Sequence, residues 1–132
     1  MRRFTILLLI AIFTALGAAD DFAGPYAGEW KSNSSGNGGT IHFKLNSAPG
    51  GGWTCDLTFG LQDSDVKTTM REVRVQDRKL ELAYDFEIQG AALRSRVKGE
   101  WNGSAFAGTF ETSLVDGSAA VDSGTWNAAR PK

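Results

Sequence analysis

KLELAYDFEIQGAALRSRVKGEWNGSAFAGTFET, residues 79–112, is the stretch that decides the fold, because strand alternation and turn residues occur in it together. Apolar and polar side chains alternate along it, as they do in strands with one buried face. Gly90-Ala91 and Asn102-Gly103 interrupt the alternation and have the composition of two-residue hairpin turns. The stretch therefore predicts three antiparallel strands joined by two tight turns.

These two turns predict which residues lie opposite each other on the three strands. In the predicted register, opposite charges pair on the outer face, and most bulky residues of the inner face lie opposite small or branched ones. A shift of one residue would move every apolar side chain to the outer face, so the alternation opposes such a shift. The predicted pairs are Phe86 with Ser95, Tyr84 with Val97, Glu87 with Arg94, Asp85 with Arg96, Gly99 with Phe106, Ser95 with Phe110 and Arg94 with Glu111.

Further strands are predicted on both sides of this stretch, because the same alternation recurs between clusters of Gly, Asn, Asp and Ser. Consecutive antiparallel strands with short connections are best closed into an up-and-down barrel, since closure leaves no exposed sheet edge. A barrel of eight antiparallel strands is therefore predicted, and a β-sandwich is the alternative. The predicted strands are residues 26–31, 40–46, 53–59, 66–75, 79–89, 92–101, 104–112 and 118–128.

Two β-bulges, each an extra residue in one strand, are needed to keep the apolar side chains on the inner face. The apolar residues of strand 66–75 change faces midway, which predicts a bulge near Arg71. A bulge near Asp122 is also predicted, because without it Trp126 would not lie opposite Gly108. Each bulge should be visible as a shift in strand register.

The N-terminal residues have the composition of a secretory signal peptide. Arg2 and Arg3 precede an apolar run, residues 6–16, that is too short to span a bilayer comfortably, and small residues suited to cleavage follow it. We therefore expect a signal peptide over residues 1–19 and a single domain over residues 20–132. The mature protein should be secreted or periplasmic, without an integral membrane segment.

Composition and motifs argue against several kinds of function. The formal net charge is −1 and the Lys and Arg residues are dispersed, so nucleic acid is not a predicted partner. The only histidine, His42, has no suitably spaced metal-ligating partners, and no cofactor or catalytic motif occurs. Cys55, the only cysteine, excludes an internal disulfide and is predicted to be a buried, inert thiol. We therefore expect no catalytic residues, metal or cofactor.

A glycine two positions before an aromatic residue recurs in the predicted strands. Such a glycine lets a neighbouring ring lie against bare backbone, so the motif predicts packing rather than chemistry. The repeats are Gly28-Glu29-Trp30, Gly99-Glu100-Trp101, Gly108-Thr109-Phe110 and Gly124-Thr125-Trp126.

Gly28-x-Trp30, together with Arg130 just beyond the last predicted strand, resembles the pattern of lipocalins and other calycin barrels. The resemblance implies that Trp30 and Arg130 close one end of the barrel through a cation–π contact of about 1 kcal/mol. The C-terminal run Gly-Thr-Trp-x-Ala-x-Arg, residues 124–130, resembles that of small secreted bacterial proteins of unassigned function.

The interior of the predicted barrel is the remaining place for a function. An eight-stranded barrel is either filled by side chains or wide enough for one small ligand. The entrance to such a site is expected at the loops after Lys31, Asn46 and Gly60. The candidate ligand-binding residues all face inward, and they are Trp53, Tyr84, Phe86, Ser95, Trp101 and Phe110.

Three functional hypotheses follow from this interior. The first is an exported, non-enzymatic barrel that binds a small apolar or amphipathic molecule. The second is a packed structural or interaction module that displays its loops to a protein or glycan partner. The third, an enzyme of unidentified type, requires a pair of carboxylates that face inward or line a cleft. A cavity above roughly 300 Å³ would favour the first hypothesis, and a filled interior would exclude it.

Overall fold

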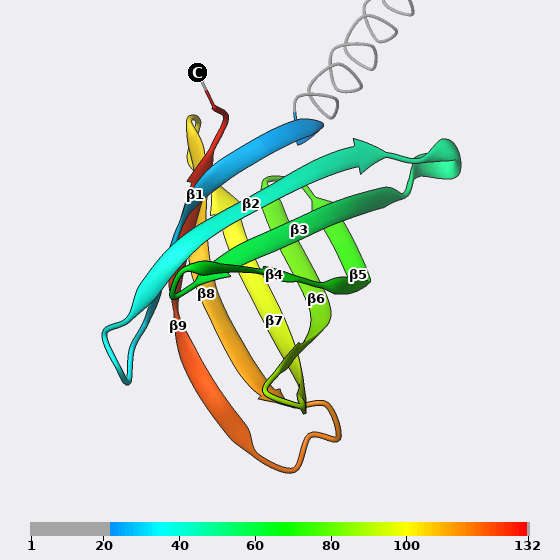
Figure 1. Cartoon of the computed structure of the whole chain (residues 1–132). Helices are drawn as coiled ribbons and strands as arrows, with labels where there is room; N and C mark the ends of the chain where they lie inside the picture. The colour runs from blue at the N-terminus through cyan, green and yellow to red at the C-terminus, as the bar shows by residue number, and fades with distance from the viewer. Residues whose placement is uncertain (1–21, 132) are drawn as a thin grey trace, which may run out of the picture.

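The structure is a computed structural model that describes residues 22–131, so the predicted signal peptide, residues 1–19, lies outside the described residues. The strands are β1 (Gly24–Ser32), β2 (Gly38–Ser47), β3 (Trp53–Leu61), β4 (Ser64–Lys67), β5 (Thr69–Gln76), β6 (Lys79–Ile88), β7 (Ala91–Trp101), β8 (Ala105–Leu114) and β9 (Ala120–Ala129). A short 3-10 helix, η2 (Pro49–Gly51), lies between β2 and β3. The nine strands form one antiparallel sheet (Figure 1).

The sheet curls into a nearly closed up-and-down barrel. Its strand order is β4-β3-β2-β1-β9-β8-β7-β6-β5, so the first strand pairs with the last. The two edge strands, β4 and β5, follow each other along the chain, and β5 also contacts β3. The predicted barrel class is confirmed, because the described strands form one rolled sheet instead of the two stacked sheets of a sandwich.

Nine strands form where eight were predicted, because the predicted strand 66–75 divides at Thr68. β4 pairs with β3, whereas β5 pairs with β6. The Thr68 hydroxyl donates a hydrogen bond to the carbonyl of Leu57 at 2.8 Å. β3 and β5 contact each other but are not hydrogen-bonded neighbours in the sheet, and we call the place where they meet the seam. The Thr68 bond therefore links the chain between β4 and β5 to β3 at the seam.

The β6–β7 hairpin turns one residue earlier than predicted, at Gln89-Gly90 instead of Gly90-Ala91. Gln89 and Gly90 both have positive φ, 52° and 85°, as the two central residues of a type I′ turn require. The predicted pairs are therefore wrong by two residues: Phe86 lies opposite Leu93, Tyr84 opposite Ser95, Asp85 opposite Arg94 and Glu87 opposite Ala92, instead of Ser95, Val97, Arg96 and Arg94.

The β7–β8 hairpin turns one residue later than predicted, at Gly103-Ser104. The reason is the side chain of Asn102, whose Oδ1 accepts hydrogen bonds from the amides of Ser104 at 3.0 Å and Ala105 at 2.9 Å. Asn102 therefore precedes the centre of the turn and stabilises it through its side chain. The predicted pairs are again wrong by two residues: Gly99 lies opposite Gly108, Ser95 opposite Thr112 and Arg94 opposite Ser113, instead of Phe106, Phe110 and Glu111.

Both predicted β-bulges are confirmed. In the β5–β6 pair, Arg71 is the extra residue. In the β8–β9 pair, the extra residue is Val121, directly before Asp122, and Trp126 lies opposite Gly108 as predicted. In each hairpin the cross-strand pairing differs from the prediction by two residues. Because two is an even number, the apolar side chains stay on the inner face, and the bulges keep them there in β5 and β9.

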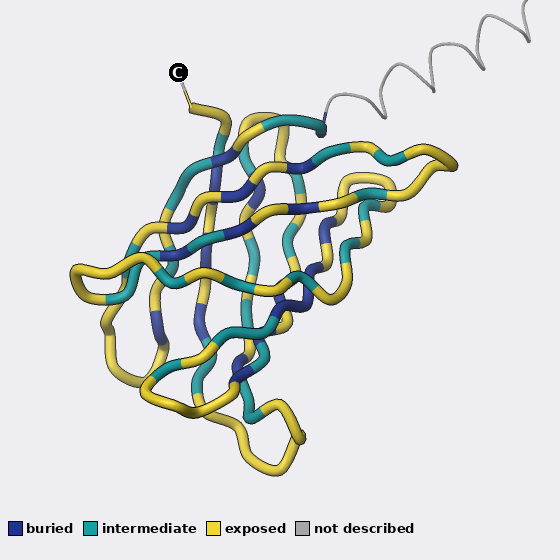
Figure 2. The backbone as a smooth tube through the Cα atoms, turned by 45° about the vertical axis from the view of Figure 1, so that its right-hand side comes forward, coloured by how far each residue is buried: buried dark blue, intermediate teal, exposed yellow. Residues whose placement is uncertain are grey.

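The hydrophobic core lies inside the barrel, and Figure 2 shows buried residues recurring along β2 and β3 between more exposed ones. The indole of Trp126 lies against Gly99, and its Nε1 donates a hydrogen bond to the carbonyl of Lys98 at 3.0 Å. A Cβ at Gly99 would overlap this ring, so the glycine has the packing role that its motif predicted. The most deeply buried large side chains are those of Tyr26, Leu45, Leu80, Val97 and Phe106.

Replacing Gly99 by alanine should destabilise the barrel, because the added methyl group meets the Trp126 ring. We expect Gly99→Ala to lower the free energy of unfolding by about 1–3 kcal/mol, the range for overpacked cores, as measured by urea denaturation. Gly52→Ala is the control: its φ is −84° and nothing lies within 4 Å of a Cβ there, so stability should change by less than about 0.5 kcal/mol. Equal stability of the two variants would contradict this packing role.

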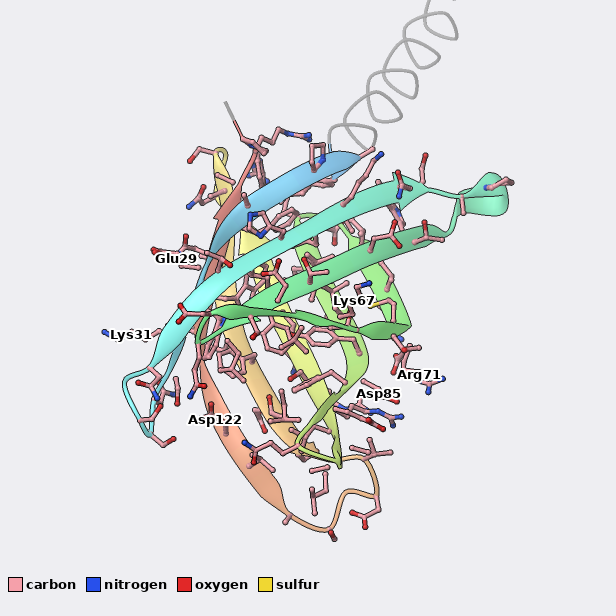
Figure 3. All side chains as sticks on the ribbon, in the orientation of Figure 1. Glu29, Lys31, Lys67, Arg71, Asp85 and Asp122 are labelled. Carbon is pink, nitrogen blue, oxygen red and sulfur yellow. The ribbon has the colours of Figure 1, made fainter. Side chains whose placement is uncertain are left out.

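Asp85 is the centre of an ion-pair network on the outer face of the barrel. Arg94 donates two hydrogen bonds to its carboxylate, from Nε at 2.6 Å and from Nη2 at 3.0 Å, and Arg71 donates one at 2.8 Å. Figure 3 shows Arg71 beside Asp85. The Arg94 hydrogen bonds, with a smaller contribution from Arg71, lower the pKa of Asp85 from 3.8 to about 2.

Asp85→Asn should remove a contribution to stability that depends on pH. Because the folded state lowers the pKa of Asp85, the ionised carboxylate stabilises the fold above a pH of about 4, and this contribution is lost as the pH falls through about 2. Solvent screens the network, since the Arg71 side chain is 54% exposed, so we expect a loss of about 1 kcal/mol at neutral pH. Denaturation at decreasing pH should show the difference from wild type shrinking. A constant difference would contradict the assignment.

Candidate functional site

A cavity of about 220 Å³ lies inside the barrel, and its lining is mainly apolar. Leu61, Ile88 and Val121 lie at its open end, next to the β3–β4 turn, the β6–β7 turn and the β8–β9 loop. Val121 is 51% exposed, so this end of the cavity reaches the surface. The aromatic residues that line the cavity are Trp30, Phe59, Tyr84, Phe86, Phe110 and Trp126.

The open end agrees with only part of the predicted entrance. The loop after Gly60 borders the opening, and the loop after Lys31 reaches it through Ser34, whose hydroxyl donates a hydrogen bond to Asp122 at 3.1 Å. The loop after Asn46 lies at the other end of the barrel (Figure 1), so it does not border this opening. Consecutive connections of an up-and-down barrel alternate between its two ends, so neighbouring loops cannot share one entrance.

Aromatic edges and faces form one wall of the cavity. The Trp30 ring meets Phe59 and Phe110 edge-on, with centroid distances of 6.2 and 6.0 Å, and Phe59 meets Phe86 edge-on at 5.0 Å. The indole Nε1 of Trp30 donates a hydrogen bond to the carbonyl of Gly60 at 3.0 Å. This bond fixes the indole across β2, so the wall has a defined shape before any molecule binds.

Four polar residues form a line across the cavity, one on each of the neighbouring strands β6, β7, β8 and β9. Tyr84, Ser95, Thr112 and Asp122 are successive cross-strand partners, and we call them the polar belt. The Ser95 and Thr112 hydroxyls lie 2.6 Å apart, both in buried residues. Burial raises the pKa of Tyr84 to about 12, although the neighbouring Ser95 hydroxyl acts in the opposite direction. The hydroxyl of Tyr84 therefore stays protonated at neutral pH.

Asp122 brings the only carboxylate among the described residues that line the cavity. Its Oδ1 accepts hydrogen bonds from the hydroxyls of Ser32 at 2.7 Å and Ser34 at 3.1 Å, and from the amide of Ser123 at 2.8 Å. The bulge at Val121 places Asp122 opposite Thr112, on the same side of the strand as the inward-facing Trp126. Without this extra residue Val121 would lie opposite Thr112, so the bulge is what brings a charge into the apolar interior.

Four of the six predicted ligand-binding residues line the cavity: Tyr84, Phe86, Ser95 and Phe110. The other two, Trp53 and Trp101, pack against the hydrophobic core but do not line the cavity. Trp101 contacts Phe106, Phe22 and Tyr26, with centroid distances of 5.1, 5.8 and 6.3 Å. Alternation identifies the inner face of a strand, but it does not give the height of a residue along the barrel axis, and this is why these two residues were predicted together with the four that line the cavity.

The predicted contact between Trp30 and Arg130 does not form. The Arg130 guanidinium lies over the Tyr26 ring, with Cζ 5.0 Å from the centroid, and its Nη1 donates a hydrogen bond to the carbonyl of Ala23 at 2.9 Å. Trp30 instead lines the cavity. Arg130 follows the end of β9, which pairs with the beginning of β1, so it lies nearer Tyr26 than Trp30 in the register.

Trp30, Thr112 and Asp122 also line the cavity, and none of them was among the predicted ligand-binding residues. For Asp122 the signal was present. With the bulge that was predicted beside it, Asp122 lies an even number of residues from Trp126 on a regular strand. Both side chains therefore lie on the inner face.

The other chemically reactive side chains lie outside the cavity lining. His42 is exposed, and Cys55 is buried, with its pKa raised to about 12 chiefly by desolvation, so its thiol stays protonated. Residues 22–131 contain no cluster of three or more His, Cys, Asp or Glu residues that could hold a metal ion. Within the same residues, no helix has the length and apolar character needed to cross a membrane.

Comparison with known proteins finds no family model that matches this chain, no curated protein of similar sequence and no solved structure of similar fold. The cavity and its residues are therefore the basis for the function proposed below.

Removing the Thr112 hydroxyl should destabilise the protein, because Ser95 would lose its buried partner. We expect Thr112→Val, which keeps the side-chain shape, to lower the free energy of unfolding by about 1–2 kcal/mol in urea denaturation. Thr109→Val removes a hydroxyl from an exposed position of the same strand and should change stability by less than about 0.5 kcal/mol. A Thr112→Val variant as stable as wild type would show that the hydroxyl pair contributes nothing to stability.

Proposed function

We propose that this protein is an exported, non-enzymatic β-barrel that binds one small, mainly apolar molecule inside the barrel. The observation that carries the proposal is the cavity itself, which combines a fixed aromatic wall with a short line of polar groups. Ligand sites commonly have this composition, in which apolar contacts supply most of the affinity and a few polar groups set the orientation. The barrel is also compatible with the calycin resemblance, in whose members the interior is the ligand site.

The size of the cavity limits the molecule that it accepts. Its volume of about 220 Å³ is below the 300 Å³ expected for a drug-sized ligand, yet the interior is not filled. An apolar cavity of about 150 Å³ holds a benzene molecule, so by proportion this one accepts a molecule of roughly nine non-hydrogen atoms. The proposed ligand is therefore a small aromatic or short aliphatic compound rather than a long-chain lipid.

Titration calorimetry with 2-phenylethanol, a neutral aromatic compound of this size, tests the proposal. We expect one binding site with a dissociation constant of roughly 10 µM to 1 mM, the range available to so small a ligand. Leu93→Trp should weaken binding at least about tenfold, because Leu93 is buried and lines the cavity, so that the larger ring fills it. Native mass spectrometry of the protein from its own host would show which molecule it retains.

Ala92→Trp is the matched control for this experiment. Ala92 is the exposed neighbour of Leu93 on β7, so the same indole is added on the outer face. Binding to Ala92→Trp should equal that of wild type. An absence of binding to wild type, or equal binding by the two tryptophan variants, would contradict a ligand site in the barrel. It would favour the alternative of a structural or interaction module that displays its loops to a protein or glycan partner.

A further inference from the structure

Asp122 distinguishes this cavity from a purely apolar one. Most of its neighbours in the lining are apolar, and no Lys or Arg is among the described residues that line the cavity. None of the ion pairs between residues 22 and 131 involves Asp122, whereas Asp85 on the outer face has two arginine partners. Figure 3 shows that Asp122 and Asp85 lie on well-separated parts of the barrel, and that Lys31 extends outward.

The hydrogen bonds of Asp122 leave part of its carboxylate available. All three recorded donors, from Ser32, Ser34 and Ser123, bond to Oδ1, and Oδ2 has no hydrogen bond within the described part of the chain. These three bonds hold the carboxylate in place without neutralising its charge, because the donors are two hydroxyls and an amide. A carboxylate in partly desolvated, apolar surroundings interacts more strongly with a charged partner than it would in water.

The neighbouring residue on β8 adds a second acceptor. Thr112 lies opposite Asp122, and its hydroxyl shares a 2.6 Å hydrogen bond with Ser95. Whichever of the two hydroxyls donates that bond, both oxygens retain lone pairs that can accept another. An ammonium group has three donors and no acceptor, so it suits a position beside a carboxylate and hydroxyl oxygens.

We propose that the ligand of this cavity is a small amphipathic amine, whose ammonium group binds Asp122 and the Thr112 hydroxyl while its apolar body lies against Trp30, Phe86 and Phe110. This inference rests on the proposed function, since it requires the cavity to be the ligand site. The bulge at Val121 acquires a function in this arrangement, because it brings the carboxylate into the interior. An anionic ligand of the same size is disfavoured, since it would place like charges together.

Three ligands with the same phenylethyl body test this inference: phenethylamine, 2-phenylethanol and 3-phenylpropanoate. We expect wild-type protein to bind the amine at least about tenfold more tightly than the alcohol, the effect of a charge-assisted hydrogen bond, and the carboxylate least tightly. Asp122→Asn should reduce the preference for the amine to less than about threefold and leave affinity for the alcohol nearly unchanged, because the amide keeps the shape and an acceptor for Ser32. Calorimetry at constant ionic strength measures all three.

Asp56→Asn is the matched control, because Asp56 is an exposed residue of β3 and the net charge changes equally. This variant should keep the wild-type preference for the amine. Equal binding of amine and alcohol by wild type would overturn the assignment to Asp122 but leave the ligand site in place, as would an Asp122→Asn variant that keeps the preference. Failure of all three ligands to bind would instead contradict the proposed function. The ranking on wild-type protein decides the question even if Asp122→Asn does not fold.

Discussion

The pairing of β1 with β9 is the constraint on which the rest of the structure depends. It places Trp30 opposite Trp126 and joins the first described strand to the last, so that the sheet curls on itself and gains an interior. In the rolled sheet every strand has one face toward solvent and one toward the interior. The alternation in its sequence therefore buries apolar side chains and leaves polar ones in solvent. The cavity also depends on this pairing, because its walls come from strands at both ends of the chain.

The chemistry of the interior depends on register more than on composition. The two hairpin shifts bring Ser95 opposite both Tyr84 and Thr112, and the bulge at Val121 brings Asp122 to the end of the same line. In the register that the turns alone suggested, Ser95 would lie between Phe86 and Phe110, and Tyr84 would lie opposite Val97. A polar belt in an otherwise apolar lining is therefore a consequence of backbone geometry at two turns and one bulge.

The sequence predicted the barrel class, the inner faces and both bulges. All three follow from which side chains share one face of a strand, and the alternation of apolar and polar residues shows this directly. It did not predict the turn centres, since moving the first turn to Gln89-Gly90 changes each pair by two residues and leaves every face the same. Alternation also does not give the height of a residue along the barrel axis, so it could not show that Trp53 and Trp101 lie outside the cavity lining. Asp122 is a different case, because the bulge predicted beside it already implies that its carboxylate lies on the inner face.

The seam is the stretch of the barrel wall that is held together by the fewest backbone hydrogen bonds. Along most of the wall adjacent strands share a ladder of backbone bonds, whereas β3 and β5 meet without one. Transient breathing of the native state should therefore begin there, since opening it breaks the fewest bonds. Cys55 is buried and lies on β3 before the part that pairs with β4. The rate at which an alkylating reagent modifies its sulfur therefore measures how often the barrel opens at the seam.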